Sequence, residues 1–302
     1  MLTSTNWIDY ELLDAGSGEK LERWGEYILR RPDPEAIWPK TLSEAEWKKA
    51  DGTYNRIEGG GKWKWKNGMP EKWQIKFGDL NFWIKPTGFK HTGLFPEQAV
   101  HWSWLASQLG EREKVKGKSN DEQFHATTSD LRTPNVLNLF AYTGAATVAS
   151  AKAGAKVTHV DSSKGIVTWA KENLELNGLG ESSRLIVDDV FKFLAREEKR
   201  GTKYDGIIMD PPVFGRGTEN ETWRIEKMLY PLVLQCVRLL SPDPLFFLVN
   251  SYVAGVSPTA LQNVLTKALG NKGGKIESDE LGIPIKGSEL ALPAGVFARW
   301  SK

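Results

Sequence analysis

Short apolar runs alternate with amphipathic stretches from residue 135 to residue 249. The stretches have helical periodicity, and two of them end on the stop signals Asn177-Gly178 and Gly201. The runs predict strands at residues 135–140, 156–160, 184–187, 204–209 and 245–249. Strands that are apolar throughout and alternate with helices are typical of a parallel sheet covered on both faces. The pattern therefore predicts a doubly wound, Rossmann-like α/β domain.

Two further expectations complete this domain. Residues 275–284 and 295–300 have the pattern of strands joined without a helix, which predicts an antiparallel strand at one edge of the sheet. In the helix that ends at Gly201, the spacing predicts that Phe191, Leu194 and Ala195 share the buried face.

Residues 1–90 carry a different pattern. Residues 56–90 alternate as short strands do, and Glu19–Arg31 predicts a charged amphipathic helix. The run 111–122 is polar and of mixed charge, which predicts an exposed linker. We expect a small N-terminal α+β domain over residues 1–90 and the doubly wound domain over residues 91–302.

Composition narrows the classes of protein. At 302 residues, 40% hydrophobic and 26% charged, the chain is typical of a folded globular protein. Its single cysteine, Cys236, excludes an intramolecular disulfide, and the four histidines lack metal-ligand spacing, so no metal is expected. The chain lacks a run of ~20 apolar residues and a signal-peptide pattern, so we expect a cytoplasmic protein with no membrane partner.

Polar residues at the ends of the predicted strands are the candidates for ligand binding. Open parallel sheets bind ligands beyond the carboxyl ends of their strands. The first strand runs into a tight turn that ends at Gly144, and the second ends in Asp161, 17 residues later. A carboxylate there can accept the hydroxyls of a ribose, and Asp188 and Asp189 follow the third strand. The alternative interpretation is that Gly144 only makes a turn and Asp161 only caps a helix.

The glycine pattern favours one class of nucleoside ligand. Dinucleotide sites use G-x-G-x-x-G because a pyrophosphate lies against the helix start, and the turn before Gly144 has a single glycine. The phosphate-binding pattern G-x-x-x-x-G-K-[ST] does not occur either. A nucleoside without a diphosphate fits better, which indicates S-adenosylmethionine.

The fourth strand ends in Asp210-Pro211-Pro212-Val213-Phe214. The prolines stiffen this loop and leave carbonyls free to accept from an amino group, while Asp210 and Phe214 offer a carboxylate and a stacking face. Such a loop can hold a planar base by its edge and face. A proline-terminated strand with a buried phenylalanine is the plain alternative.

In their order and spacing, these motifs resemble the class I S-adenosylmethionine-dependent methyltransferases. The segments NLFAYTG (138–144), DS (161–162) and DPPVFG (210–215) are similar to the group that contains the bacterial 23S ribosomal RNA methyltransferases. The resemblance covers about residues 91–302 and implies a ribose contact from Asp161 with Ser162 beside it. The other implied cofactor contacts are Asn138, Phe140, Tyr142, Thr143 and Gly144 at the methionine end, Asp189 at the adenine, and Phe95 and Gln98 closing over the cofactor.

One departure from the family bears on the reaction. Members that methylate carbon 5 of cytosine are expected to carry a cysteine nucleophile after the fifth strand, where this chain has Asn250-Ser251-Tyr252. Cys236 lies in an apolar helical stretch, which favours a buried structural thiol. Methylation of a base nitrogen needs alignment and a proton acceptor, which Asp210 and the carbonyls of Pro211 and Pro212 could supply.

The basic, aromatic-rich strip of residues 56–90 is a candidate RNA surface. It carries eight Lys and Arg against three acidic residues, interleaved with aromatic side chains. Alternate aromatics are also typical of the core of a small β domain. We expect methylation of a base in ribosomal RNA. The alternatives are a small-molecule or protein methyltransferase, in which the strip is only core, and a non-catalytic RNA-binding assembly factor.

Overall fold

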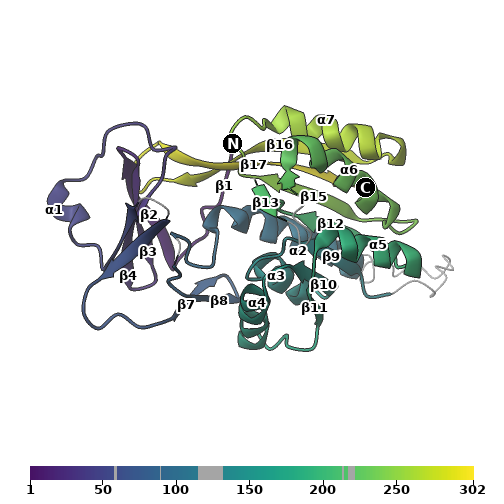
Figure 1. The fold of residues 1–302 in the computed structure, drawn as a ribbon, viewed down its shortest axis with the longest axis horizontal. Helices are drawn as coiled ribbons and strands as arrows, with labels where there is room; N and C mark the ends of the chain where they lie inside the picture. Colours follow the sequence, from purple (N-terminus) through teal and green to yellow (C-terminus); the bar gives the residue numbers. More distant parts are fainter. Residues whose placement is uncertain (58–59, 89, 115–131, 213, 217–221) are drawn as a thin grey trace. The chain divides into compact units, whose positions relative to one another are not determined.

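The computed structural model describes residues 1–57, 60–88, 90–114, 132–212, 214–216 and 222–302 (Figure 1). They form two compact units. The first comprises Met1–Val100 and Glu280–Gly295, and the second comprises His101–Asp279 and Val296–Lys302. The late segment 280–295 therefore belongs with the N-terminal unit. Among the described residues, no helix is both long and apolar enough to cross a membrane.

The described strands of the second unit confirm the predicted α/β fold. In the eight-stranded sheet of the described residues the strand order is β1-β16-β17-β15-β12-β9-β10-β11. The strands β9, β10, β11, β12 and β15 are mutually parallel, and β17 is antiparallel to β15. Their bounds are β9 (Asn135–Leu139), β10 (Lys156–Asp161), β11 (Ser183–Val187), β12 (Gly206–Met209), β15 (Phe246–Ser251), β16 (Lys275–Pro284) and β17 (Ala291–Ser301). The tail strands are thus present, and the short strand β1 (Leu2–Thr3) pairs with β16 inside the first unit.

Helices cover both faces of this sheet (Figure 1). The helices are α2 (Ala99–Lys114), α3 (Ala145–Lys152), α4 (Lys164–Leu176), α5 (Val190–Arg200), α6 (Ile225–Arg238) and α7 (Pro258–Leu269). Side chains of α5, α6 and α7 share a core with alternate strand residues such as Leu137 and Phe247. The intervening strand residues face the other layer, where Trp104 of α2 contacts Phe246 and Thr147 of α3 contacts Asn138. After α7 follows the short 3₁₀ helix η3 (Gly270–Lys272).

Two local expectations in this unit are wrong in part. In α5 Leu194 is buried and Phe191 is half-buried against the core, as expected, but Ala195 is exposed. The other buried side chains of α5 are Val190, Phe193 and Glu197. The large ring of Phe193 and the Glu197 carboxylate, which has hydrogen-bond partners, occupy the buried face of the helix, and the small Ala195 side chain lies outside it. The predicted linker 111–122 does not begin at residue 111, because α2 continues through Lys114 in a run of good helix formers. Its remainder lies outside the described residues.

The first unit is built mainly of strands. A five-stranded sheet has the order β2-β3-β4-β5-β6, and β7 and β8 form a separate hairpin. Their bounds are β2 (Tyr10–Gly16), β3 (Glu19–Trp24), β4 (Tyr27–Pro32), β5 (Gly52–Ile57), β6 (Gly60–Trp65), β7 (Trp73–Phe77) and β8 (Leu80–Ile84). The short helices of this unit, within the described residues, are α1 (Glu44–Trp47) and the 3₁₀ helix η1 (Pro96–Gln98).

The predicted helix over Glu19–Arg31 is wrong, because this segment is the hairpin of β3 and β4. Trp24 pairs with Tyr27 across a two-residue loop whose Gly25 has a φ of 65°. Glycine reaches this left-handed region without strain and starts a tight hairpin turn. The fully buried Glu22 pairs across the hairpin with Arg31 at 2.7 Å. Helical periodicity does not anticipate such long-range pairing.

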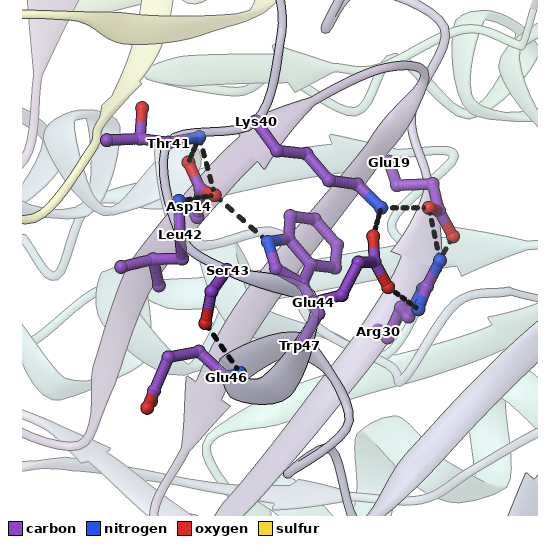
Figure 2. Close-up of polar contacts among 10 residues, drawn as sticks. All are labelled: Asp14, Glu19, Arg30, Lys40, Thr41, Leu42, Ser43, Glu44, Glu46 and Trp47. Carbon is purple, nitrogen blue, oxygen red and sulfur yellow. Dashed lines mark hydrogen bonds and ion pairs between the residues drawn. The ribbon is translucent and has the colours of Figure 1, made fainter.

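Buried polar contacts hold the short helix α1 against the sheet (Figure 2). The Asp14 carboxylate accepts hydrogen bonds from the backbone N–H groups of Thr41 and Leu42 and from the Trp47 indole, at 3.1, 2.8 and 3.0 Å. The Ser43 hydroxyl caps the helix by accepting from the backbone N–H of Glu46. A four-residue helix is not stable alone, so these contacts determine its position.

Candidate active site

The chain reverses its direction across the sheet at β9. From β9 it moves to β10 and β11 on one side, and then to β12 and β15 on the other. Such a switch point is where open α/β sheets bind ligands. The loops after β9 and β12 start side by side, because the N–H of Asp210 donates to the Leu139 carbonyl at 3.4 Å. The sheet thus brings the predicted turn 140–144 and the Asp210 loop to one place.

The turn after β9 has an unusual backbone. Phe140 and Tyr142 have φ values of 53° and 50°, in the left-handed region that side chains rarely adopt. They are two of the three non-glycine residues with positive φ in the described part of the chain. Each such residue costs about 1–3 kcal/mol and clusters of them occur where a ligand is bound. This backbone strain makes the turn a candidate functional site.

Asp161 holds this turn in place. Its two carboxylate oxygens accept hydrogen bonds from the backbone N–H groups of Tyr142 and Ser163, each at 3.0 Å. Burial raises the pKa of Asp161, and hydrogen bonds from the backbone of Ser163, Tyr142 and Ser162 oppose this rise. The half-buried carboxylate therefore sits at the end of β10 and links the two loops that begin there.

Gly144 allows the turn to pass close to α4. It has a φ of 84° and is the N-cap of α3. A Cβ atom at this position would lie 3.0 Å from the Cβ atom of Ala170 and 3.4 Å from its Cα atom. Both the positive φ and this contact favour glycine. Gly144 therefore makes a turn, as the alternative interpretation expected. A turn of this kind is also compatible with a ligand at the start of α3.

A buried network of hydrogen bonds lies next to the turn 140–144. The Asn138 amide donates to the Thr147 hydroxyl at 2.9 Å, and this hydroxyl lies 3.0 Å from Nδ1 of His159. All three side chains are buried, and burial lowers the pKa of His159 to about 3, so its ring is neutral. The buried Thr143 has its carbonyl oxygen fixed by the Asn173 amide at 2.9 Å. The residues that shape the turn are therefore themselves held by hydrogen bonds.

The residues after β11 have local partners. The Asp189 side chain caps α5 by accepting from the backbone N–H of Lys192 at 3.0 Å. Asp188 accepts from the backbone N–H of Asp189 and pairs with Arg196. These contacts fix the start of α5 at the same edge of the sheet as Asp161. The adenine contact of Asp189 remains a prediction.

Trp223 is a site residue that the sequence interpretation missed. It lies in β14 (Thr222–Arg224), which pairs with β13 (Phe214–Arg216) directly after the Asp210 loop. Its indole N–H donates to the Pro212 carbonyl at 2.5 Å, so this carbonyl is not free as the sequence suggested. Its ring centroid lies 5.9 Å from those of Phe140 and Phe191. Trp223 thus joins the turn after β9, the start of α5 and the loop after β12. The signal in the sequence was a tryptophan 11 residues after Pro212.

Comparisons with known proteins identify the family. Residues 122–246 match the family model of S-adenosylmethionine-dependent methyltransferases. The solved S-adenosylmethionine-dependent methyltransferase of Agrobacterium tumefaciens is 36% identical, with a TM-score of 0.89 over 99% of this chain and 92% of that chain. This chain belongs to the S-adenosylmethionine-dependent methyltransferases. The family resemblance expected from the sequence is therefore confirmed.

Other relatives of this methyltransferase match it less completely. The ribosomal RNA large subunit methyltransferase K/L of Shewanella frigidimarina is 32% identical over 226 residues, which are 73% of this chain and 27% of that protein. The chain spans about a quarter of the length of such K/L relatives. A methyltransferase solved with S-adenosylhomocysteine is 20% identical, with a TM-score of 0.71 over 98% of this chain and 76% of that chain, which supports the fold alone.

Replacing Trp223 by phenylalanine tests its link to the Asp210 loop of this methyltransferase. The variant keeps an aromatic ring against Phe140 and Phe191 but leaves the Pro212 carbonyl without its donor. Pro212 is exposed, so water can replace the lost donor, but the indole no longer positions the loop. Misplaced acceptors slow a reaction that depends on alignment, so we expect kcat to fall about 10-fold. The dissociation constant for S-adenosylmethionine should change less than about twofold, because the turn and Asp161 are unaltered. Steady-state kinetics and calorimetry measure the two quantities.

The control for this variant is Trp169→Phe. Trp169 is also a buried tryptophan of the second unit, but it lies in α4. Its replacement should leave kcat near the wild-type value. An equal decrease of kcat in both variants would show that Trp223 acts only through general stability.

Phe95 and Gln98 lie in the first unit. Phe95 is the N-cap of η1, Gln98 ends this helix, and both side chains are half-buried. The ring of Phe95 lies 5.4 Å from that of His91. Their closure over the cofactor of the methyltransferase remains a prediction.

Cys236 does not have the surroundings of a nucleophilic cysteine. It lies in α6, is fully buried in the core shared with α5 and α7, and burial raises the pKa of its thiol. A reactive cysteine needs a stabilised thiolate and access to substrate. The interpretation of Cys236 as a structural thiol is confirmed.

Proposed function

We propose that this methyltransferase transfers a methyl group from S-adenosylmethionine to a base nitrogen of ribosomal RNA. The observation that carries the proposal is the strained turn 140–144 held by Asp161 at the switch point of the sheet. The ribosomal RNA large subunit methyltransferases K/L among its relatives support the RNA substrate. The chain matches only part of those proteins, so substrate and activity belong to this proposal.

The site has the groups that the cofactor needs. The Asp161 carboxylate, with Ser162 beside it, would accept the ribose hydroxyls, and Asp189 would contact the adenine. The remaining contacts, at the methionine end, would come from Phe140, Tyr142, Thr143, Gly144 and Asn138. The positive φ values in this turn and the absence of a side chain at Gly144 favour close approach of a ligand to the backbone. When bound, S-adenosylmethionine supplies a methyl group on a sulfonium, which a base nitrogen can attack in line.

The loop after β12 would orient the base. Asp210 would accept a hydrogen bond from the base and hold the proton that the nitrogen releases. The Pro211 carbonyl is the second acceptor, whereas the Pro212 carbonyl is engaged by Trp223 and holds the loop in shape. Phe214, the first residue of β13, is the predicted stacking residue. The prolines limit movement of these acceptors, so the loop would align the base rather than react with it.

Replacing Cys236 by alanine tests the choice between nitrogen and carbon-5 chemistry. Carbon-5 methylation needs a cysteine thiolate adduct, and Cys236 is the sole cysteine of the chain. Alanine fits the apolar core without burying a hydroxyl. We expect methyl transfer by the Cys236→Ala variant at the wild-type rate, measured as S-adenosylhomocysteine release. A folded but inactive variant would favour covalent chemistry and contradict the proposal.

The substrate class is tested by turnover with fractionated extracts. We expect S-adenosylhomocysteine release with total RNA and none with RNA-free protein or metabolite fractions. Mass spectrometry of ribosomal RNA nucleosides from a deletion strain should then show the loss of one N-methylated base. Turnover with an RNA-free fraction alone would identify a protein or small-molecule methyltransferase. Binding of RNA without turnover would identify an assembly factor.

A further inference from the structure

Strands β5 and β6 form a ribbon at the edge of the five-stranded sheet. This β5–β6 ribbon comprises residues 52–57 and 60–65. Within the described residues, β6 pairs with β5 alone. The pairing of β4 with β5 ends at Thr53, so the ribbon beyond this residue has no further strand beside it in the described structure. The outer edge of β6 therefore has no paired strand within the described residues.

One face of the β5–β6 ribbon is an aromatic platform. The rings of Trp63 and Trp65 stack with centroids 4.4 Å apart and planes inclined by 18°, and Tyr54 meets Trp63 edge-on at 5.4 Å. The opposite glycines make room for these rings. A Cβ atom on Gly52 would lie 2.0 Å from the Trp65 ring, and one on Gly61 would lie 2.5 Å from the Tyr54 ring. Both tryptophans nevertheless remain half-buried rather than buried, so part of the platform is accessible.

The β5–β6 ribbon also carries exposed positive charge. Arg56 lies opposite Gly61 and therefore on the aromatic face, whereas Lys62 and Lys64 alternate with the tryptophans and lie on the other face. All three are exposed, and none forms an ion pair in the part of the chain that the structure describes. The two strands contain no acidic residue. The charges are thus free to neutralise phosphates.

The hairpin of β7 and β8 buries its aromatic side chains more completely than the β5–β6 ribbon does. In β7 and β8, which belong to the same basic strip of sequence, Trp73, Phe77 and Phe82 are buried. The two interpretations of the strip therefore apply to different strands. Trp73, Phe77 and Phe82 are core, whereas Trp63 and Trp65 of β6 are stacked on each other and partly accessible.

We propose that the β5–β6 ribbon binds single-stranded RNA. Unpaired bases would stack on Trp63 and Trp65, and phosphates beside them would pair with Arg56 on the same face. Lys62 and Lys64, on the other face of β6, would pair with phosphates where the RNA strand passes around the open edge of the ribbon. Stacking on a flat ring requires a base that is not already stacked in a duplex, and single-strand sites combine such rings with positive charge. The inference rests on the proposed function, because it takes the substrate to be RNA. It adds that the β5–β6 ribbon binds this RNA and that the bound RNA is single-stranded.

The tryptophan variants test stacking. Fluorescence anisotropy measures the affinity of the full chain for a labelled single-stranded oligoribonucleotide and for the same sequence as a duplex. We expect preference for the single strand and a decrease in affinity of about 10-fold or more in Trp63→Ala/Trp65→Ala. The control is Trp83→Ala, since Trp83 is a half-buried tryptophan of β8 with Lys72 over its ring at 4.2 Å. This control should bind as the wild type does.

The lysine variants test phosphate pairing. For single strands the slope of log affinity against log salt becomes shallower by about 0.7 for each phosphate that the protein no longer neutralises. We expect this change in Lys62→Gln/Lys64→Gln. The control Lys267→Gln/Lys272→Gln removes the same charge from exposed lysines of the second unit and should leave the slope unchanged.

The outcomes separate this inference from the proposed function. Equal binding by wild type and Trp63→Ala/Trp65→Ala, or preference for the duplex, overturns the ribbon as a single-strand site even if RNA is methylated. If the ribbon variants bind more weakly as expected but the wild type methylates no RNA, the binding assignment stands and the proposed function fails. Equal effects of both lysine pairs on the salt slope would also overturn the inference, because RNA affinity would then depend only on the net charge of the protein.

Discussion

Replacing Asp161 by alanine should remove most of the affinity for S-adenosylmethionine while the chain stays folded. The carboxylate holds the strained turn through Tyr142 and would also accept the ribose hydroxyls. Hydrogen bonds to a charged group contribute about 1.5–3 kcal/mol each, so losing two lowers affinity about 100-fold or more. Because Asp161 is only half-buried, water can solvate the N–H groups that lose their acceptor. Isothermal calorimetry measures the affinity and circular dichroism the fold.

The control for this variant is Asp161→Asn. Asparagine keeps one side-chain oxygen that can accept from the Tyr142 N–H, but it lacks the charge and the second acceptor. We expect an affinity between those of the wild type and Asp161→Ala. Unchanged cofactor affinity in the alanine variant would refute the assignment of Asp161 to the ribose.

Replacing Arg31 by methionine should destabilise the first unit by about 3 kcal/mol, because the buried Glu22 carboxylate loses its closest charged partner and keeps only Lys20 at 3.6 Å. Arg31 donates two hydrogen bonds to Glu22, at 2.7 and 2.8 Å, and Tyr10 donates a third at 2.8 Å. Glu22 is fully buried, and Arg31 is 5% exposed. The destabilisation is measured by hydrogen exchange of the backbone amides in β2, β3 and β4.

The same pair makes the first unit sensitive to acid. Burial alone would raise the pKa of Glu22, but the charges of Arg31 and Lys20 and the hydrogen bonds from Arg31 and Tyr10 outweigh it and lower the pKa to about 2. The folded pKa is below the ordinary value of 4.5. The stabilisation is therefore complete above pH 4.5 and is lost as the pH falls from 4.5 toward 2.

The double variant Glu22→Leu/Arg31→Met is the control for both expectations. Replacing both charged partners by apolar residues leaves no buried carboxylate and deprives only the Tyr10 hydroxyl of its acceptor, so the decrease in stability should be smaller than in Arg31→Met. Its amides should also lose less protection between pH 4.5 and pH 3 than those of the wild type. Equal acid sensitivity in the two proteins would contradict the role of Glu22.

Much of the site could be predicted because its signals are local. Gly144, Asp161 and Asp210 follow apolar runs directly, and parallel strands bring their carboxyl ends to one edge whatever the details of packing. The role of Trp223 could not be predicted in this way. It depends on a contact with the carbonyl of Pro212 and on the rings of Phe140 and Phe191, which come together only in the folded chain.

The sequence by itself determined the α/β order of the second unit, the turn at Gly144 and the acidic residues beyond the strands, because hydrophobic periodicity and glycine placement act over a few residues. The tertiary structure alone decided that residues 19–31 form a hairpin and that Trp73, Phe77 and Phe82 are core while the tryptophans of β6 are partly accessible. It also decided that Tyr142 adopts its strained conformation against Asp161. Each of these depends on partners distant along the chain, since buried charge pairs, ring contacts and strained backbone are stable only when the surrounding fold supplies the compensating interactions.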